Sequence, residues 1–199
     1  MISDLALRWV VTVTFVLSAA ECAVGVILGD RHWRRVIGQV LHIVMALAMA
    51  VMAWPRGAAL PTIAPMLFFL LATAWYVGVV VAVADHRLVN GYHGAMMLAM
   101  AWMYAVMNGN LLPGQAPHGT HQMGMAMPDT HTHGGGYPAW ITAINSFWTV
   151  GFALAALWWT YRFFEERRHR PTEPAYPFFG VACQSMMAAG MAIMFGVML

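Results

Sequence analysis

Six long apolar stretches, separated by polar or charged connections, leave this chain few ways to fold. Each stretch is close to the roughly 20 residues that an α-helix needs to cross the hydrocarbon core of a membrane. Only 9% of the residues are charged, against about 25% in a soluble domain. We therefore expect residues 1–199 to form a single all-α integral membrane domain with six transmembrane helices. The expected helices cover about Leu5–Leu28, Ile37–Trp54, Thr62–Ala84, Gly91–Leu112, Tyr137–Tyr161 and Tyr176–Leu199.

The arginines predict the orientation of these helices. The chain has no lysine, and eight of its ten arginines lie in or beside the first, third and fifth connections. Only Arg8 and Arg56 lie on the opposite side. Because cytoplasmic connections carry the excess of basic residues, we expect a multi-pass protein of the cell membrane with both termini and the long loop 113–136 outside. The net charge of +2 comes from these helix-end residues and does not indicate a nucleic-acid partner.

Ionisable side chains in several of the expected helices fall at one depth. Glu21, His42 and His93 each lie six to nine residues from a charged residue at the inner helix end, which is roughly 9–14 Å at 1.5 Å per residue. Cys22 and Cys183 belong to about the same depth. Ionisable groups within a membrane usually face the bundle interior and pair with one another, so this layer predicts a metal or proton site, and zinc is an acceptable metal there. The alternative is that Glu21 hydrogen-bonds one histidine and fixes helix packing without an ion.

Amide and hydroxyl side chains could support such a site. Gln39 lies one turn before His42 and could fix the tautomer of that ring. Asn145, Ser146 and Gln184 are further polar groups within the expected helices. Such groups more often hold helices together than bind ligands, although they could orient metal ligands.

Methionine recurs at helical spacing on three of the expected helices, and the chain holds 18 methionines in all. The ones assigned to the candidate metal site are Met45, Met49, Met96, Met97, Met100, Met187 and Met191. At about 100° per residue each set lies on one helix face, and soft thioether donors select Cu(I) over harder ions. The same spacing is also the packing seam of a helical bundle, and methionine fills irregular apolar gaps. These rows of methionines on single helix faces, here called methionine stripes, therefore predict either a row of weak copper sites or an ordinary core.

The loop 113–136 holds a second concentration of the same donors. Its candidate ligands are His118, His121, Met123, Met125, Met127, His131 and His133. The alternate spacing of the three methionines lets their sulfurs converge if the segment is extended. Imidazole and thioether donors together favour copper, with zinc or nickel as competitors. The loop therefore predicts extracytoplasmic metal capture, the alternative being a flexible linker whose ligands never converge.

Three segments resemble a family of small actinobacterial polytopic membrane proteins known only as a domain of unknown function. They are GDRHWRR after the first helix, LHIVMALAMAVMAW in the second and NGYHGAMMLAMAWMY in the fourth. The resemblance covers nearly the whole chain and implies no established activity. In its outer Met/His segment and transmembrane methionines the chain also looks similar to eukaryotic-type copper transporters. Those have three helices and one MxxxM motif, so this likeness of motif implies neither a common fold nor transferable residue roles.

These features favour a membrane protein that handles copper by Cu(I) capture, transport or delivery, with lipid and the metal ion as its partners. One alternative is a b-type haem protein with His42 and His93 as axial ligands. Another is a non-catalytic accessory or assembly subunit of a respiratory complex or copper enzyme, or a homo-oligomer, whose stripes are interfaces. No Gly-rich phosphate loop, HExxH, GxSxG or CxxC motif is present, which favours a role without catalytic residues.

Overall fold

The computed structural model describes residues 5–28, 33–54, 61–82, 87–114, 138–169 and 176–199, and this part of the chain is helical without strands. It forms six helices, as the sequence predicts. Their bounds are α1 Leu5–Leu28, α2 Trp33–Met52, α4 Ile63–Ala82, α5 Arg87–Asn108, α6 Ala139–His169 and α7 Tyr176–Val197. The largest difference from the expected spans is in α6, which continues for two further turns beyond Tyr161 into charged sequence.

Four of these helices are long and apolar enough to cross a membrane: α1, α4, α6 and α7. The apolar stretch described for α2 is Val36–Met52, which follows Arg34 and Arg35 in the first turn of the helix. In α5 the polar side chains of Asn90 and His93 lower the mean hydropathy. Length and composition therefore support a membrane protein with several spans.

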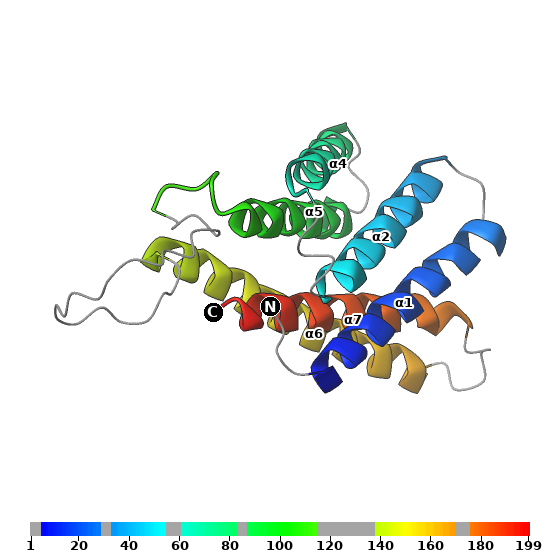
Figure 1. The fold of residues 1–199 in the computed structure, drawn as a ribbon. Coiled ribbons are helices and arrows are strands. Elements are labelled where there is room, and N and C mark those ends of the chain that lie inside the picture. Colours follow the sequence, from blue (N-terminus) through cyan, green and yellow to red (C-terminus); the bar gives the residue numbers. More distant parts are fainter. Residues whose placement is uncertain (1–4, 29–32, 55–60, 83–86, 115–137, 170–175) are drawn as a thin grey trace, which may run out of the picture.

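Helices α1 and α6 run in one direction across the bundle, and α2, α5 and α7 run in the other. In Figure 1, α1 and α6 end toward the right of the view, whereas α2, α5 and α7 begin there. The closest neighbours are α1 with α2 and α7, α4 with α5, and α6 with α7. This arrangement brings the first half of α5 and of α7, the middle of α2 and the second half of α1 to the same level of the bundle.

Methionine dominates the core of the described part of the chain. Eight of the twelve largest fully buried side chains there are methionines, and the others include Phe15, Phe69 and Phe195. Many leucines and valines instead lie on the outside, for example Leu71 at 72% and Leu157 at 67% exposed. Lipid tails are as apolar as leucine, so this distribution costs little in a membrane. The methionine stripes thus face the interior, where their flexible side chains fill the gaps between helices.

Polar side chains join the helices at several levels. Asn145 is fully buried and accepts a hydrogen bond from Trp102 Nε1 at 3.0 Å, which links α6 to α5. The hydroxyls of Thr160 and Ser185 lie 2.6 Å apart and link α6 to α7. Asn145 therefore has the packing role that is more common for such a residue within a membrane helix.

A glycine at the contact of α7 with α1 gives a test of this packing. A Cβ on Gly190 would lie 2.5 Å from Cζ of the fully buried Phe15, and 3.0 and 3.1 Å from the two neighbouring ring carbons. The Phe15 ring is fully buried, so it cannot move away from an added methyl group without disturbing its neighbours. We therefore expect Gly190→Ala to lower the free energy of unfolding by about 1–3 kcal/mol. Denaturation in detergent, followed by circular dichroism, measures this difference.

Gly196→Ala on the same helix is the matched control. Its added Cβ would make an ordinary contact of 3.8 Å with Thr149 Cγ2. Alanine also has the higher helix propensity, so this variant should be at least as stable as the parent protein. Equal losses in the two variants would contradict the close contact between α1 and α7.

Candidate functional site

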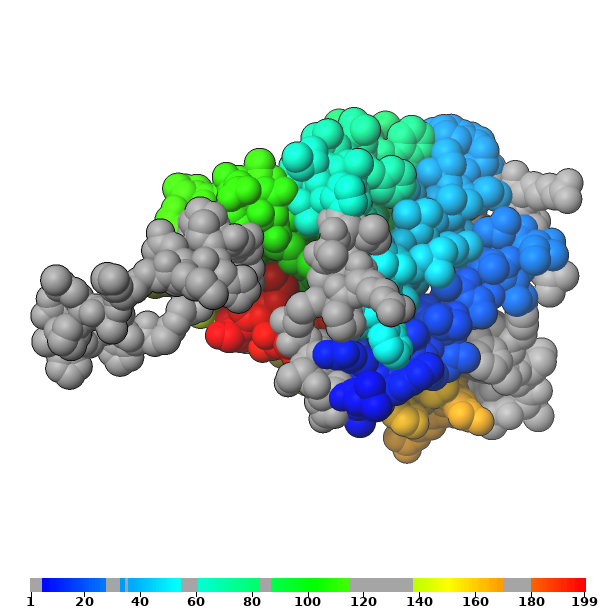
Figure 2. Space-filling model, in the orientation of Figure 1, coloured from blue at the N-terminus to red at the C-terminus, as the bar shows by residue number. Residues whose placement is uncertain are grey.

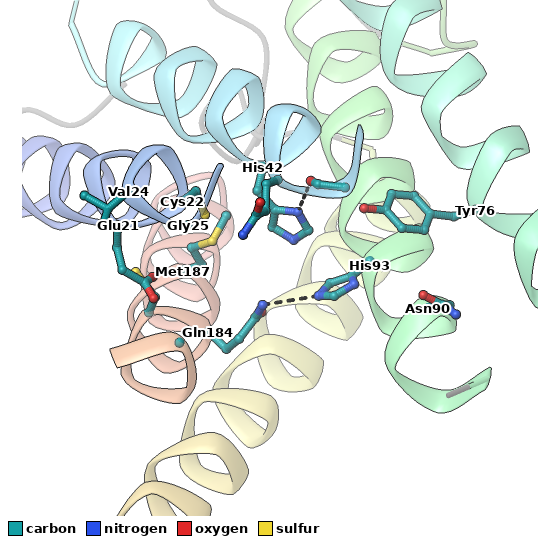
Figure 3. A pocket seen from close by; sticks show the side chains of 14 residues that line it. Glu21, Cys22, Val24, Gly25, His42, Tyr76, Asn90, His93, Gln184 and Met187 are labelled. Atoms are coloured by element: carbon teal, nitrogen blue, oxygen red, sulfur yellow. Dashed lines mark hydrogen bonds between the residues drawn. The ribbon is translucent and has the colours of Figure 1, made fainter. Parts of the chain in front are cut away.

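Helices α1, α2, α4, α5 and α7 together line a cavity of about 640 Å³ (Figure 3). Its polar and sulfur-containing side chains are Glu21, Cys22, Gln39, His42, Tyr76, Asn90, His93, Cys183, Gln184 and Met187. The volume lies within the range of small-molecule sites in proteins. The depth count along the sequence thus identified five side chains that line one cavity: Glu21, Cys22, His42, His93 and Cys183.

His42 presents an unpartnered nitrogen to this cavity. The side chain is only 5% exposed, and its Nδ1–H donates a hydrogen bond of 2.7 Å to the carbonyl oxygen of Gly38. Nε2 then carries a lone pair, and it has no hydrogen-bond partner in the described part of the chain. A ring with Nδ1 held by a backbone carbonyl and Nε2 open is the form in which histidine binds metals.

The group that orients this ring is therefore the Gly38 carbonyl, and the expectation that Gln39 does so is wrong. Gln39 turns toward α1, where its amide occupies the place of the missing side chain of Gly25. A Cβ on Gly25 would collide with the Gln39 Nε2 atom. Gly25 thus lets the polar edge of α2 approach α1 at the level of the cavity.

His93 lies directly beside His42. The two ring centroids are 4.4 Å apart with an interplanar angle of 81°, an edge-to-face contact. Gln184 Nε2 lies 3.2 Å from His93 Nε2, so the amide donates to that nitrogen while Gln184 Oε1 has no partner among the described residues. A half-turn of the amide would let Oε1 accept from Nε2–H and leave the lone pair on Nδ1. The orientation of the Gln184 amide therefore controls whether the lone pair of His93 is occupied, on Nε2, or free for a ligand, on Nδ1.

The thiols and the carboxylate lie on the α1 and α7 side of the cavity. Cys183 is 7% exposed and lies beside Glu21 and Ser18. Glu21 Oε1 would be 3.7 Å from a Cβ on Gly180, and in Figure 3 the carboxylate points toward α7, away from the two imidazoles. Within the described residues Glu21 makes no hydrogen bond to a histidine, so the alternative of a Glu–His packing bond is not what the structure shows.

The cavity does not hold a closed cage of hard and borderline ligands. In the described ranges, no group of three or more His, Cys, Asp or Glu side chains is close enough to hold a metal ion. The predicted layer is therefore divided into an imidazole pair on α2 and α5 and a thiol and carboxylate group on α1 and α7. Met187, which is 1% exposed, lines the cavity together with both groups.

Tyr76 is a cavity residue that the sequence reasoning missed. Its hydroxyl is buried and unpartnered within the described part of the chain, and a Cβ on Gly38 would lie 3.4 Å from it. Its ring is 5.7 Å from that of His93. The sequence contained a signal for it, since Tyr76 lies nine residues before Asp85, the same offset that separates Glu21 from Asp30.

The remaining candidate ligands are either core residues or lie outside the described residues. The methionines other than Met187 that were assigned to the site are all fully buried in the core: Met45, Met49, Met96, Met97, Met100 and Met191. None of them lines the cavity. The loop ligands lie outside the described residues: His118, His121, Met123, Met125, Met127, His131 and His133. For the six core methionines, packing is a sufficient explanation.

The contact between the two imidazoles also bears on the haem alternative. Two axial ligands must lie on opposite faces of a porphyrin, with the macrocycle between them. The rings of His42 and His93 instead touch edge to face. This arrangement leaves no space for a porphyrin between the two rings, so it does not fit a haem with both histidines as axial ligands.

Comparison with known sequences places the chain in a family. Residues 34–198 match the family described as Domain of unknown function (DUF5134). The chain belongs to this family. It is 48% identical, over 213 aligned positions, to Uncharacterized protein Mb0995 of Mycobacterium bovis and Uncharacterized protein Rv0970 of Mycobacterium tuberculosis. The alignments cover 100% of this chain and 99% of each relative.

The mycobacterial relatives confirm the resemblance to an actinobacterial family of unknown function. No solved structure matches the chain significantly. The family thus supplies no activity, and the functional argument rests on the cavity.

The tautomer of His42 is directly testable. We expect its Nδ1 to be protonated and its Nε2 to be bare, because the Gly38 carbonyl accepts a hydrogen bond from Nδ1. Long-range ¹⁵N–¹H NMR spectra of metal-free protein labelled at histidine distinguish the two tautomers. The His42→Gln variant assigns the signal by its loss. A proton on Nε2 of His42 would contradict the arrangement described above.

Proposed function

We propose that this protein handles Cu(I) within the membrane and that the cavity is its intramembrane ion site. The observation that carries the proposal is the Nε2 lone pair of His42. A buried polar atom without a partner costs free energy, and a metal ion entering the cavity would satisfy it. His93, with its ring beside that of His42, supplies the second imidazole.

The donor set favours monovalent copper over zinc. Beside the imidazoles the cavity offers the thiols of Cys22 and Cys183 and the thioether of Met187. Thiolate and thioether sulfur are soft donors that suit Cu(I). A structural zinc site needs four ligands in a closed tetrahedron, whereas the described residues provide no group of three such ligands. Cu(I) is satisfied by fewer, softer ligands, which this cavity supplies.

A partly formed site also suits an ion that must leave again. Tight, closed coordination stores a metal, whereas conduction or delivery requires binding that is weak enough for release. The separation of the imidazole pair from the thiols and Glu21 gives the ion two alternative sets of donors along the cavity. We propose capture by the His/Met loop 113–136 as the preceding step.

We further propose that all six helices cross the membrane, with both termini outside. Polar side chains of α2 and α5 lie in the interior of the bundle, since Gln39 and His42 on α2 and Asn90 and His93 on α5 line the cavity. Polar residues that face the interior of a bundle do not meet lipid. The two opposite helix directions and the eight-to-two division of the arginines support one common inner side.

Two engineered cysteines test this orientation. We expect Thr120→Cys, in the loop 113–136, to react with a membrane-impermeant maleimide in intact cells. Thr172→Cys, in the connection between α6 and α7, should react only after the cells are opened. The parent protein gives the background from Cys22 and Cys183, which lie within the helices. Labelling of position 172 from outside would reverse the proposed topology.

Removal of His42 tests the copper site. The loop ligands are first replaced so that only the cavity can contribute, and Cu(I) affinity is then measured against a chromophoric competing chelator under anaerobic conditions. We expect His42→Ala to weaken Cu(I) binding at least about tenfold, the lower end of what loss even of an outer-shell partner costs. Cu(I) itself is the probe, and metal analysis measures how much copper stays bound to each variant.

His169→Ala is the matched control, because this histidine is exposed at the end of α6 and lies outside the cavity. It should bind Cu(I) like the parent. Thermal unfolding of all three proteins in the same detergent shows whether His42→Ala remains folded. If both variants keep the parent's affinity, the cavity is not the copper site.

A further inference from the structure

A second hollow lies between the first turn of α2 and the last turns of α4. It is a groove of about 270 Å³, lined by Trp33, Arg34, Ala74, Trp75, Gly78, Val79 and Ala82. Figure 2 shows α4 lying against α2 on one face of the molecule. The groove is apart from the central cavity, with which it shares no lining residue. Both helix ends belong to the side that the arginines assign to the cytoplasm.

The rim of the groove combines aromatic rings with one cation. Trp33 and Trp75 meet edge to face with their ring centroids 5.6 Å apart, and both are exposed. The Arg34 guanidinium carbon lies 5.4 Å from the centre of the Trp33 ring. Tryptophan is enriched at the boundary between hydrocarbon and headgroups. This rim therefore suits the level at which lipid phosphates lie.

Among the described residues, Arg34 has no acidic partner, which favours contact with an anionic ligand. Contact with an aromatic face leaves the N–H groups of a guanidinium free to donate in its own plane. In the described part of the chain, the only ion pair joins Arg162 to Glu166 on α6. No acidic side chain in that part pairs with Arg34. A planar guanidinium is the side chain best suited to bidentate contact with phosphate.

The floor of the groove is formed by small apolar residues and is open above Gly78. Ala74, Val79 and Ala82 surround Gly78, and no heavy atom lies within 4 Å of a Cβ added there. The groove is smaller than the usual site for a whole small molecule, for which about 300 Å³ is the lower limit. It is suited to a single hydrocarbon chain lying along the helices below a headgroup.

We infer that this groove binds one anionic phospholipid of the cytoplasmic leaflet, with its phosphate on Arg34 and an acyl chain over Gly78. Basic pockets between membrane helices on the cytoplasmic side are recognised sites for anionic headgroups. The apolar floor favours a lipid over free phosphate, which would gain nothing from it. The inference rests on the proposed membrane orientation and is independent of copper.

Native mass spectrometry of the full chain, exchanged from detergent into phosphatidylglycerol or phosphatidylcholine, tests the inference. We expect the parent to retain phosphatidylglycerol in preference to phosphatidylcholine. Arg34→Gln should weaken phosphatidylglycerol retention about fivefold, the effect of one basic residue near a membrane surface. Gly78→Leu, which fills the open floor without changing charge, should reduce retention of both lipids.

Arg168→Gln is the matched control, an exposed arginine at the inner end of α6 that does not line the groove. It should retain lipid like the parent. Equal losses in Arg34→Gln and Arg168→Gln would show diffuse charge attraction and overturn the inference. So would unchanged retention in Gly78→Leu, or displacement of the lipid by inorganic phosphate. Because Arg34 is outside the cavity, Cu(I) affinity should be unchanged in Arg34→Gln, which separates the two proposals.

Discussion

The hydrogen bond from His42 Nδ1 to the Gly38 carbonyl is the interaction on which the site depends. It joins a side chain to the backbone one turn earlier on the same helix, so it survives any adjustment of the helices around it. An imidazole buried in an apolar interior needs partners for its nitrogens. Because one nitrogen is held within α2, the other is directed into the cavity with its lone pair unused.

Around this ring the bundle is adaptable. Its core is built largely from methionine, an unbranched side chain that fills irregular gaps without demanding one packing arrangement. Two glycines at the cavity leave room for polar side chains of neighbouring helices: Gly25 for the amide of Gln39 and Gly38 for the hydroxyl of Tyr76.

Much of the fold could be predicted from sequence, because spans of about 20 apolar residues leave one solution in a membrane. The level of Glu21, His42, His93 and Cys183 also followed from counting residues along helices of known rise. The contacts of these side chains could not be predicted in the same way. Whether Glu21 faces the imidazoles or α7 depends on the rotation of α1 about its axis. The partner of His42 is a backbone carbonyl, which every residue has, so the sequence does not single it out.

The methionine stripes show a second limit of sequence reasoning. A repeat of three and four residues places side chains on one helix face whether they pack or bind. Met187 borders the cavity, whereas Met191, one turn further along α7, is part of the core. Only the positions of the neighbouring helices distinguish the two cases. The same ambiguity applies to α5, whose methionines are core residues while His93 and Asn90 line the cavity.

Membership of DUF5134 extends these questions to relatives that share nearly half of their residues with this chain over their full lengths. The most direct measurement of the central claim is an experimental structure of protein loaded with Cu(I), with anomalous scattering recorded at the copper and zinc edges. The account predicts a copper peak inside the cavity, beside Nε2 of His42. A copper peak confined to the loop 113–136, a zinc peak in its place, or an empty cavity would contradict it.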